Sequence, residues 1–182
     1  MLIPTVENSL LVMIDMQQKL LPVIDKNEQL IDKVTQLLRG ACELNLDIAV
    51  TEQYPRGLGE TVPELSTWLP EDTPVISKTT FSVFGEAAFT AALNARSRKV
   101  LIFCGVETHI CLFQSVIDAL QKNYEVIVVS DAVGSRKESD KNNAISELQK
   151  QGASVMSVES ILFMLLRDAK HPAFKAISKL VK

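Results

Sequence analysis

The sequence predicts a three-layer α/β/α protein of Rossmann-like type, in which helices cover both faces of a mostly parallel sheet of about six strands. Short apolar runs rich in Val and Ile alternate along the chain with segments whose apolar residues recur at helical spacing. Strands that are apolar on both faces are typical of parallel sheets. The 182 residues, 47% of them hydrophobic, suffice for one large core, so we expect residues 1–182 to form a single domain.

The expected strands are short runs of apolar and often β-branched residues, which pack well on a pleated surface. SLLVMI near the start of the chain and EVIVVS in its second half are the clearest of them. In chain order, we expect strands at 9–14, 47–51, 74–77, 99–104, 125–130 and 153–157.

The expected helices lie between these strands. They are predicted at 27–44, 86–96, 108–122, 137–151 and from 159 to the end. Asp25 or Asn27 is expected to cap the first of them. His171-Pro172 is expected to break the last into two. The stretch 52–74 holds four of the seven prolines and two glycines, and we expect it to be irregular.

Composition and charge exclude several classes of function. The net charge is −3 and no Lys/Arg run is present, so we expect no nucleic-acid partner. No apolar stretch reaches the roughly 18 residues of a membrane span, and the start of the chain lacks the basic region of a signal peptide. Three cysteines, odd in number and widely spread, do not form a disulfide framework. These features predict a cytoplasmic protein whose partner is a small molecule.

Three residues with reactive side chains follow three of the expected strands. Asp15 follows the first strand, Lys78 follows the short strand that ends at 77, and Cys111 follows the strand at 99–104 across a turn. Sites in open parallel sheets lie at the carboxyl ends of strands, so one edge of the sheet can gather all three. Each also has a structural interpretation: a turn former, a surface lysine and a packing cysteine.

Together these residues indicate nucleophilic catalysis. Asp15 would accept the Cys111 proton and later give it to a leaving amine. Lys78 would hold the carboxylate and the thiolate in place, and both Lys78 and the helix start at Cys111 favour the thiolate. Cys111 would attack a carbonyl carbon and form a thioester-type intermediate that water hydrolyses. Backbone N–H groups near Glu107 and at Cys111 would stabilise the oxyanion.

Three motifs resemble those of the isochorismatase-like cysteine hydrolases. LLVMIDMQ is similar to the family's opening strand with its acid, KTTFSVF to its Lys-x-x-x-Ser-x-Phe segment, and GVETHICL to its Gly-x-x-Thr-x-x-Cys-Val signature. The resemblance implies a catalytic triad of Asp15, Lys78 and Cys111. It also implies a cis peptide between Val106 and Glu107 that aims the Glu107 N–H into the oxyanion hole. TEQYPRGLGETVPEL and HPAFKAISKLVK resemble the branch of isochorismatase domain-containing proteins.

One departure from that family concerns metal binding. Nicotinamidases carry an Asp-x-His metal motif after the second strand, whereas this chain has TEQYPRG there. Its two histidines, His109 and His171, belong to no cluster with metal-ligand spacing, so we expect neither a metal nor another cofactor. His109 is two residues from Cys111, and positions i and i+2 of a helix face apart, so it is not the expected base.

Six further residues are candidates for a substrate pocket. Gln17 could instead be a surface amide, and Gln53 and Tyr54 could belong to an interface. The two phenylalanines could instead pack in the core. The candidates are Gln17, Gln53, Tyr54, Phe81, Phe84 and Thr108.

The function predicted from these features is that of a metal-independent cysteine hydrolase that cleaves a small amide-type C–N bond. The alternative is a non-catalytic binding or scaffold protein that retains the pocket. The apolar run 161–166 exceeds what one helix face would bury within its own domain. We therefore expect a homo-oligomer, a dimer or larger.

Overall fold

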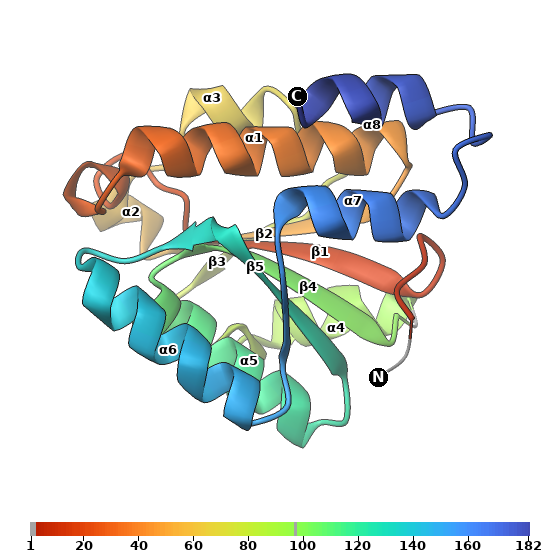
Figure 1. Ribbon diagram of the computed structural model, residues 1–182. Coiled ribbons are helices and arrows are strands. Elements are labelled where there is room, and N and C mark those ends of the chain that lie inside the picture. The colour runs from red at the N-terminus through yellow and green to blue at the C-terminus, as the bar shows by residue number, and fades with distance from the viewer. Residues whose placement is uncertain (1–2, 97) are drawn as a thin grey trace.

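The computed structural model describes residues 3–96 and 98–182, and these residues form the three predicted layers (Figure 1). One sheet of six strands lies in the middle, in the order β3-β2-β1-β4-β5-β6, and all five neighbouring pairs are parallel. The strands are β1 Ser9–Ile14, β2 Asp47–Gln53, β3 Val75–Lys78, β4 Val100–Val106, β5 Glu125–Gly134 and β6 Ser154–Met156.

Helices cover both faces of this sheet (Figure 1). On one face lie α1 Asn27–Glu43, α3 Pro63–Ser66, α7 Val158–Leu166 and α8 Phe174–Leu180. On the other lie α4 Ala87–Arg96, α5 Phe113–Gln121 and α6 Glu138–Lys150. The short α2, Pro55–Leu58, follows β2, single 3-10 turns form at Leu21–Val23 and Val83–Gly85, and a π-helical turn, Thr108–Leu112, precedes α5.

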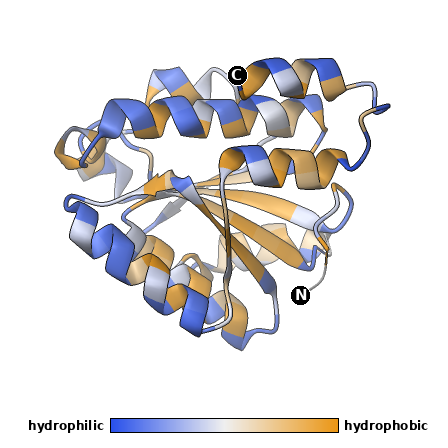
Figure 2. Ribbon diagram, viewed as in Figure 1, coloured by the Kyte–Doolittle hydropathy of each residue, from blue (hydrophilic) through white to orange (hydrophobic). Residues whose placement is uncertain are grey.

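The strands are apolar on both faces because each face contributes to its own core (Figure 2). In β1, Leu11 and Met13 pack beneath α1, whereas Leu10, Val12 and Ile14 pack on the opposite side, as the two-residue period of a strand requires. All six residues of β1 are buried. The central strands therefore hold their carboxyl ends in fixed positions.

Gly105 lets the carboxyl ends of β1 and β4 approach closely. Its φ is +107°, and a Cβ at this position would lie 2.1 Å from the carbonyl oxygen of Ile14. A side chain is excluded both by that contact and by the backbone conformation. The residue after β1 and the turn after β4 are thereby brought together.

The structure corrects one expectation about the helices and confirms another. Lys26, not Asp25 or Asn27, precedes α1; it has a φ of 52° and makes no side-chain cap. Asn27 instead donates its side-chain N–H to the carbonyl of Leu21, at 3.1 Å. The predicted break at His171-Pro172 is confirmed, since it separates α7 from α8.

The apolar run 161–166 does not form the unpartnered face expected of it. Ile161, Leu162, Leu165 and Leu166 are all buried within this chain, in the core shared with α1 and α8. The reason for expecting an oligomer from this segment was therefore wrong. In the part of the chain that is described, no helix is long and apolar enough to cross a membrane.

Candidate active site

Asp15 and Lys78 form a buried ion pair at the carboxyl edge of the sheet. Asp15 directly follows β1 and Lys78 ends β3, with β2 between them. Lys78 Nζ lies 2.7 Å from Asp15 Oδ2, and both side chains are fully buried. Thr51 on β2 donates its hydroxyl to Asp15 Oδ1 at 2.8 Å. Among the nitrogen and oxygen atoms that the structure describes, only the Lys78 ammonium contacts Oδ2.

Cys111 lies against this pair. It occupies the π-helical turn that follows β4, and its side chain is close enough to Asp15 and Lys78 for both to act on its pKa. The residue is only 6% exposed. Ser115 donates its hydroxyl to the Cys111 carbonyl at 2.6 Å, which holds the turn against α5. The fold therefore brings together the three residues selected at the strand ends.

The surroundings of Cys111 favour the thiol and not the thiolate. Burial raises its pKa from the ordinary 9.0 to about 12, and the Asp15 carboxylate also raises it, while the Lys78 ammonium opposes both. Lys78 favours the thiolate, as expected, but burial and the Asp15 carboxylate outweigh its effect on the pKa of the thiol. A reaction at Cys111 would need a base beside the sulfur, and Asp15 is the carboxylate that acts on the pKa of this thiol.

This shift predicts a specific loss of stability at alkaline pH. The folded chain keeps the Cys111 proton up to about pH 12, whereas the unfolded chain loses it near pH 9.0. The stabilisation that this difference provides is therefore complete below pH 9.0 and is lost as the pH rises from 9.0 to about 12. The wild-type free energy of unfolding should fall faster with pH than that of Cys111→Ala, by up to roughly 1.4 kcal/mol per pH unit. Urea titrations of both proteins at several pH values measure the difference. Parallel losses in the two proteins would contradict the raised pKa.

Gln17, a pocket candidate, has its side chain bound to the backbone of the segment that follows β2. It is fully buried. Its amide nitrogen donates to the carbonyl of Gln53 at 3.0 Å and to that of Gly59 at 2.6 Å, and its amide oxygen accepts the Gln53 N–H at 2.7 Å. Through these hydrogen bonds, the Gln17 side chain holds the backbone of residues 53–59 in place.

Gln17→Met should therefore destabilise the fold. It leaves one N–H and two carbonyls of the backbone without their partner, and we expect the free energy of unfolding to fall by about 3 kcal/mol. The neighbouring Gln18 is exposed and has no side-chain hydrogen bond among the described residues, so Gln18→Met is the matched control. Urea titration compares the two variants, and equal stabilities would refute this role.

The other pocket candidates comprise two exposed residues, the half-buried Phe84 and the buried Thr108. Tyr54 is 56% exposed and Phe81 is 52% exposed, and both lie next to the backbone or side chain of Lys78. Phe84 instead packs edge-on against Phe89, with 5.4 Å between ring centroids. Thr108 is fully buried and donates its hydroxyl to the Gly134 carbonyl at 2.9 Å.

The peptide bond between Val106 and Glu107 is cis, as the resemblance predicts. The Glu107 carboxylate accepts hydrogen bonds from the N–H and from Nε of Arg136, both at 3.0 Å. Neither Arg136 nor Thr51 was selected from the sequence. Both residues reach the site through the register of neighbouring strands, which no local pattern reveals.

The described residues contain no group of three or more His, Cys, Asp or Glu side chains arranged to hold a metal ion. His109 lies close to Cys111 in sequence, but its Nδ1 is 3.0 Å from the hydroxyl of Ser135. Its ring therefore has a partner on the segment after β5.

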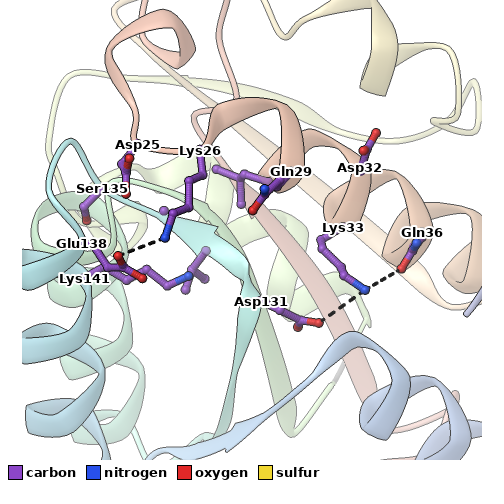
Figure 3. A pocket seen from close by; sticks show the side chains of 13 residues that line it. Asp25, Lys26, Gln29, Asp32, Lys33, Gln36, Asp131, Ser135, Glu138 and Lys141 are labelled. Atoms are coloured by element: carbon purple, nitrogen blue, oxygen red, sulfur yellow. Dashed lines mark hydrogen bonds and ion pairs between the residues drawn. The ribbon is translucent and has the colours of Figure 1, made fainter.

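A separate cleft of about 480 Å³ lies between α1, α6 and the end of β5 (Figure 3). Its charged groups largely pair with one another. Lys26 is 3.0 Å from Glu138, and Lys33 is 3.9 Å from Asp131. Neither Asp15 nor Cys111 is among its lining residues.

Comparisons with known proteins agree with these observations. A family model described as Isochorismatase domain matches residues 9–160. "Isochorismatase domain-containing protein 2" of Danio rerio is 37% identical over 175 residues, which cover 96% of this chain and 87% of the relative.

Solved structures with the same fold cover almost the whole chain. The MAR1 ribonuclease of Caenorhabditis elegans has a TM-score of 0.93 at 34% identity and covers 98% of this chain and 91% of its own. YcaC from Pseudomonas aeruginosa, solved with covalent acrylamide, has a TM-score of 0.91 at 26% identity. The match covers 97% of this chain and 90% of the YcaC chain. The YcaC gene product of Escherichia coli, described as an octameric hydrolase of unknown specificity, has a TM-score of 0.92 at 25% identity. The match covers 99% of this chain and 89% of the neighbour's chain.

Proposed function

The chain belongs to the isochorismatase family, and from that membership we propose that it is a metal-independent cysteine hydrolase acting on a small amide-type C–N bond. The observation that carries the proposal is the wholly buried Asp15–Lys78 pair, 2.7 Å apart, with the Cys111 side chain in reach of both groups. Members of this family are generally hydrolases. A nucleophile, a base and a cation that lie at one sheet edge support the same chemistry.

In the proposed first half-reaction, Asp15 takes the Sγ proton as the sulfur attacks the carbonyl carbon. A C–S bond forms and the carbonyl electrons move to oxygen. Backbone N–H groups of the Glu107–Cys111 turn would receive this oxyanion. The oxyanion then collapses, the C–N bond breaks, and Asp15 returns the proton to the leaving nitrogen. The products of this step are a free amine or ammonia and a Cys111 thioester.

In the second half-reaction, Asp15 removes a proton from water as the water oxygen attacks the thioester. The C–S bond breaks and Cys111 recovers its proton, so the released product is the acid. Lys78 keeps its charge throughout and balances the carboxylate first and the sulfur afterwards. Because Lys78 lowers the Cys111 pKa while Asp15 raises it, removal of the Asp15 charge by protonation favours the thiolate at the moment of attack.

The surroundings support a small substrate. Cys111 is 6% exposed, so only a compact group reaches the sulfur. Tyr54 and Phe81 offer exposed aromatic surface beside Lys78, which suits a flat or apolar substituent. We do not propose ribonuclease activity, which the name of the Caenorhabditis elegans neighbour states for that protein, because RNA binding relies on Lys and Arg facing phosphates and the net charge here is −3.

Assembly and location are part of the same proposal. The octameric Escherichia coli neighbour supports a homo-oligomer of this chain. Three cysteines that are free in the structure support a reducing compartment such as the cytoplasm. Light scattering that detected only a 20.1 kDa species at micromolar concentration would refute the assembly.

The experiment that tests the function is a hydrolysis screen with an acyl-enzyme trap. The wild-type protein is incubated with small amides, ureides, carbamoyl compounds and, as a separate arm, single-stranded RNA. Released ammonia or amine is quantified, and intact-mass spectrometry of quenched samples looks for an adduct on Cys111. Ligand binding without release of amine and without an adduct would instead support the non-catalytic binding protein.

A further inference from the structure

Lys78 carries a positive charge in a fully buried position, so its acceptors determine where the ammonium sits. The two shortest contacts of Nζ are 2.7 Å to Asp15 Oδ2 and 2.6 Å to Gln53 Oε1. The carbonyls of Phe81 and Thr80 lie farther away, at 3.1 and 3.3 Å. The ammonium is therefore shared mainly between one carboxylate and one neutral amide.

The Gln53 amide is itself held in one orientation. Its nitrogen donates to the carbonyl of Thr79 at 2.9 Å, which leaves the oxygen to face Lys78. Its backbone N–H is fixed by the Gln17 side chain, at 2.7 Å. Gln53 also lies opposite Lys78 in the pairing of β2 with β3. Its side chain therefore binds the residue that its backbone already adjoins in the sheet.

The charge of this acceptor matters for the chemistry at the sulfur. A carboxylate at position 53 would draw the ammonium away from Asp15 and would place a second negative charge beside the site. An apolar residue would leave one ammonium proton poorly paired and would let Nζ move. An amide supplies an acceptor without a charge.

We infer that Gln53 is a positioning residue, which holds the Lys78 ammonium where it serves both Asp15 and Cys111. This inference rests on the proposed function and extends it by one residue. Gln53 acts through Lys78, so its effect falls on the reactivity of the thiol and on the rate of the bond-making steps. A residue that only lined the pocket would affect the binding of substrate.

The test compares Gln53→Met and Gln53→Glu with the wild-type protein, with the exposed Gln149→Met as the matched control. Acrylamide is the thiol probe, and its rate of addition to Cys111 is measured across pH by intact mass. We expect the labelling rate and kcat of Gln53→Met to fall by roughly 10- to 100-fold, with KM nearly unchanged. For Gln53→Glu we expect the labelling rate at neutral and mildly alkaline pH to fall by roughly 10-fold, which is the effect of a thiol pKa raised by ~1 unit. Gln149→Met should match the wild type in all of these measurements.

Two outcomes would overturn the inference. One is a rise in KM with kcat and the labelling profile unchanged, which would make Gln53 a substrate contact. The other is identical labelling profiles for wild type and Gln53→Glu, with circular dichroism showing both folded. The labelling measurement needs no substrate, so a wild-type protein that labels with acrylamide but hydrolyses nothing would contradict the proposed function and not the role of Gln53.

Discussion

Replacing Cys111 with alanine is expected to reduce the turnover of any amide that the wild-type protein hydrolyses by at least ~10⁴-fold. The variant keeps the Asp15–Lys78 pair but has no atom that can form the C–S bond. Cys111→Ser keeps an oxygen in place of the sulfur, but a hydroxyl is far less acidic than a thiol, so we expect it to be severely impaired as well. Release of amine under saturating substrate, together with intact mass, measures both effects.

A second cysteine serves as the control for this result. Cys42 lies in α1, away from the sheet edge, and its sulfur contacts the carbonyl of Trp68 at 3.2 Å. A serine hydroxyl can make the same contact, so Cys42→Ser should retain wild-type turnover. Undiminished turnover by Cys111→Ala would exclude the thioester mechanism.

Lys78→Met is expected to have the largest combined effect on stability and reactivity. It leaves the Asp15 carboxylate buried without its cation, and loss of one member of a buried pair costs about 3–5 kcal/mol. It also removes the group that lowers the Cys111 pKa, so that pKa rises further and alkylation slows. Urea titration and pH-dependent labelling with acrylamide measure the two effects separately.

Two comparisons separate these effects from a general loss of structure. Asp15→Asn combined with Lys78→Met removes both buried charges and should recover much of the lost stability while remaining inactive. Lys33→Met removes a half-exposed lysine 3.9 Å from Asp131 and should change the free energy of unfolding by less than about 1 kcal/mol. If Lys78→Met left the labelling profile of Cys111 unchanged, the two residues would not share a site.

The order of strands and helices was largely predictable because the apolar periodicity of this chain is strong. Asp15, Lys78 and Cys111 were identified from a single rule, that the carboxyl ends of parallel strands share one edge of the sheet. The ionisation of Cys111 was not predictable in the same way. It depends on the burial of the sulfur and on its distance from two opposite charges, and neither quantity is encoded by local spacing.

The residues that were missed or assigned differently act through contacts distant in sequence. Thr51 reaches Asp15 because β2 lies beside β1, and Arg136 reaches Glu107 because β5 extends past its predicted end. Gln17 was expected to face a pocket, yet its amide matches backbone groups 36 and 42 residues further along the chain. The apolar run 161–166 was expected to exceed what its own domain could bury, because the covering α8 was not anticipated as its partner.

The burial of Cys111 has a consequence for the newly synthesised chain. Before β1, β3 and β4 have paired with their neighbours, the thiol has its ordinary pKa of 9.0 and is open to solvent, where a thiolate reacts readily with peroxides and other oxidants. Parallel pairing of distant strands is a slow event in folding, so this period is prolonged. Once the sheet has formed, the residue is 6% exposed and its thiol stays protonated. Folding therefore lowers the thiolate fraction of this residue at neutral pH, and with it the rate at which oxidants react with its sulfur.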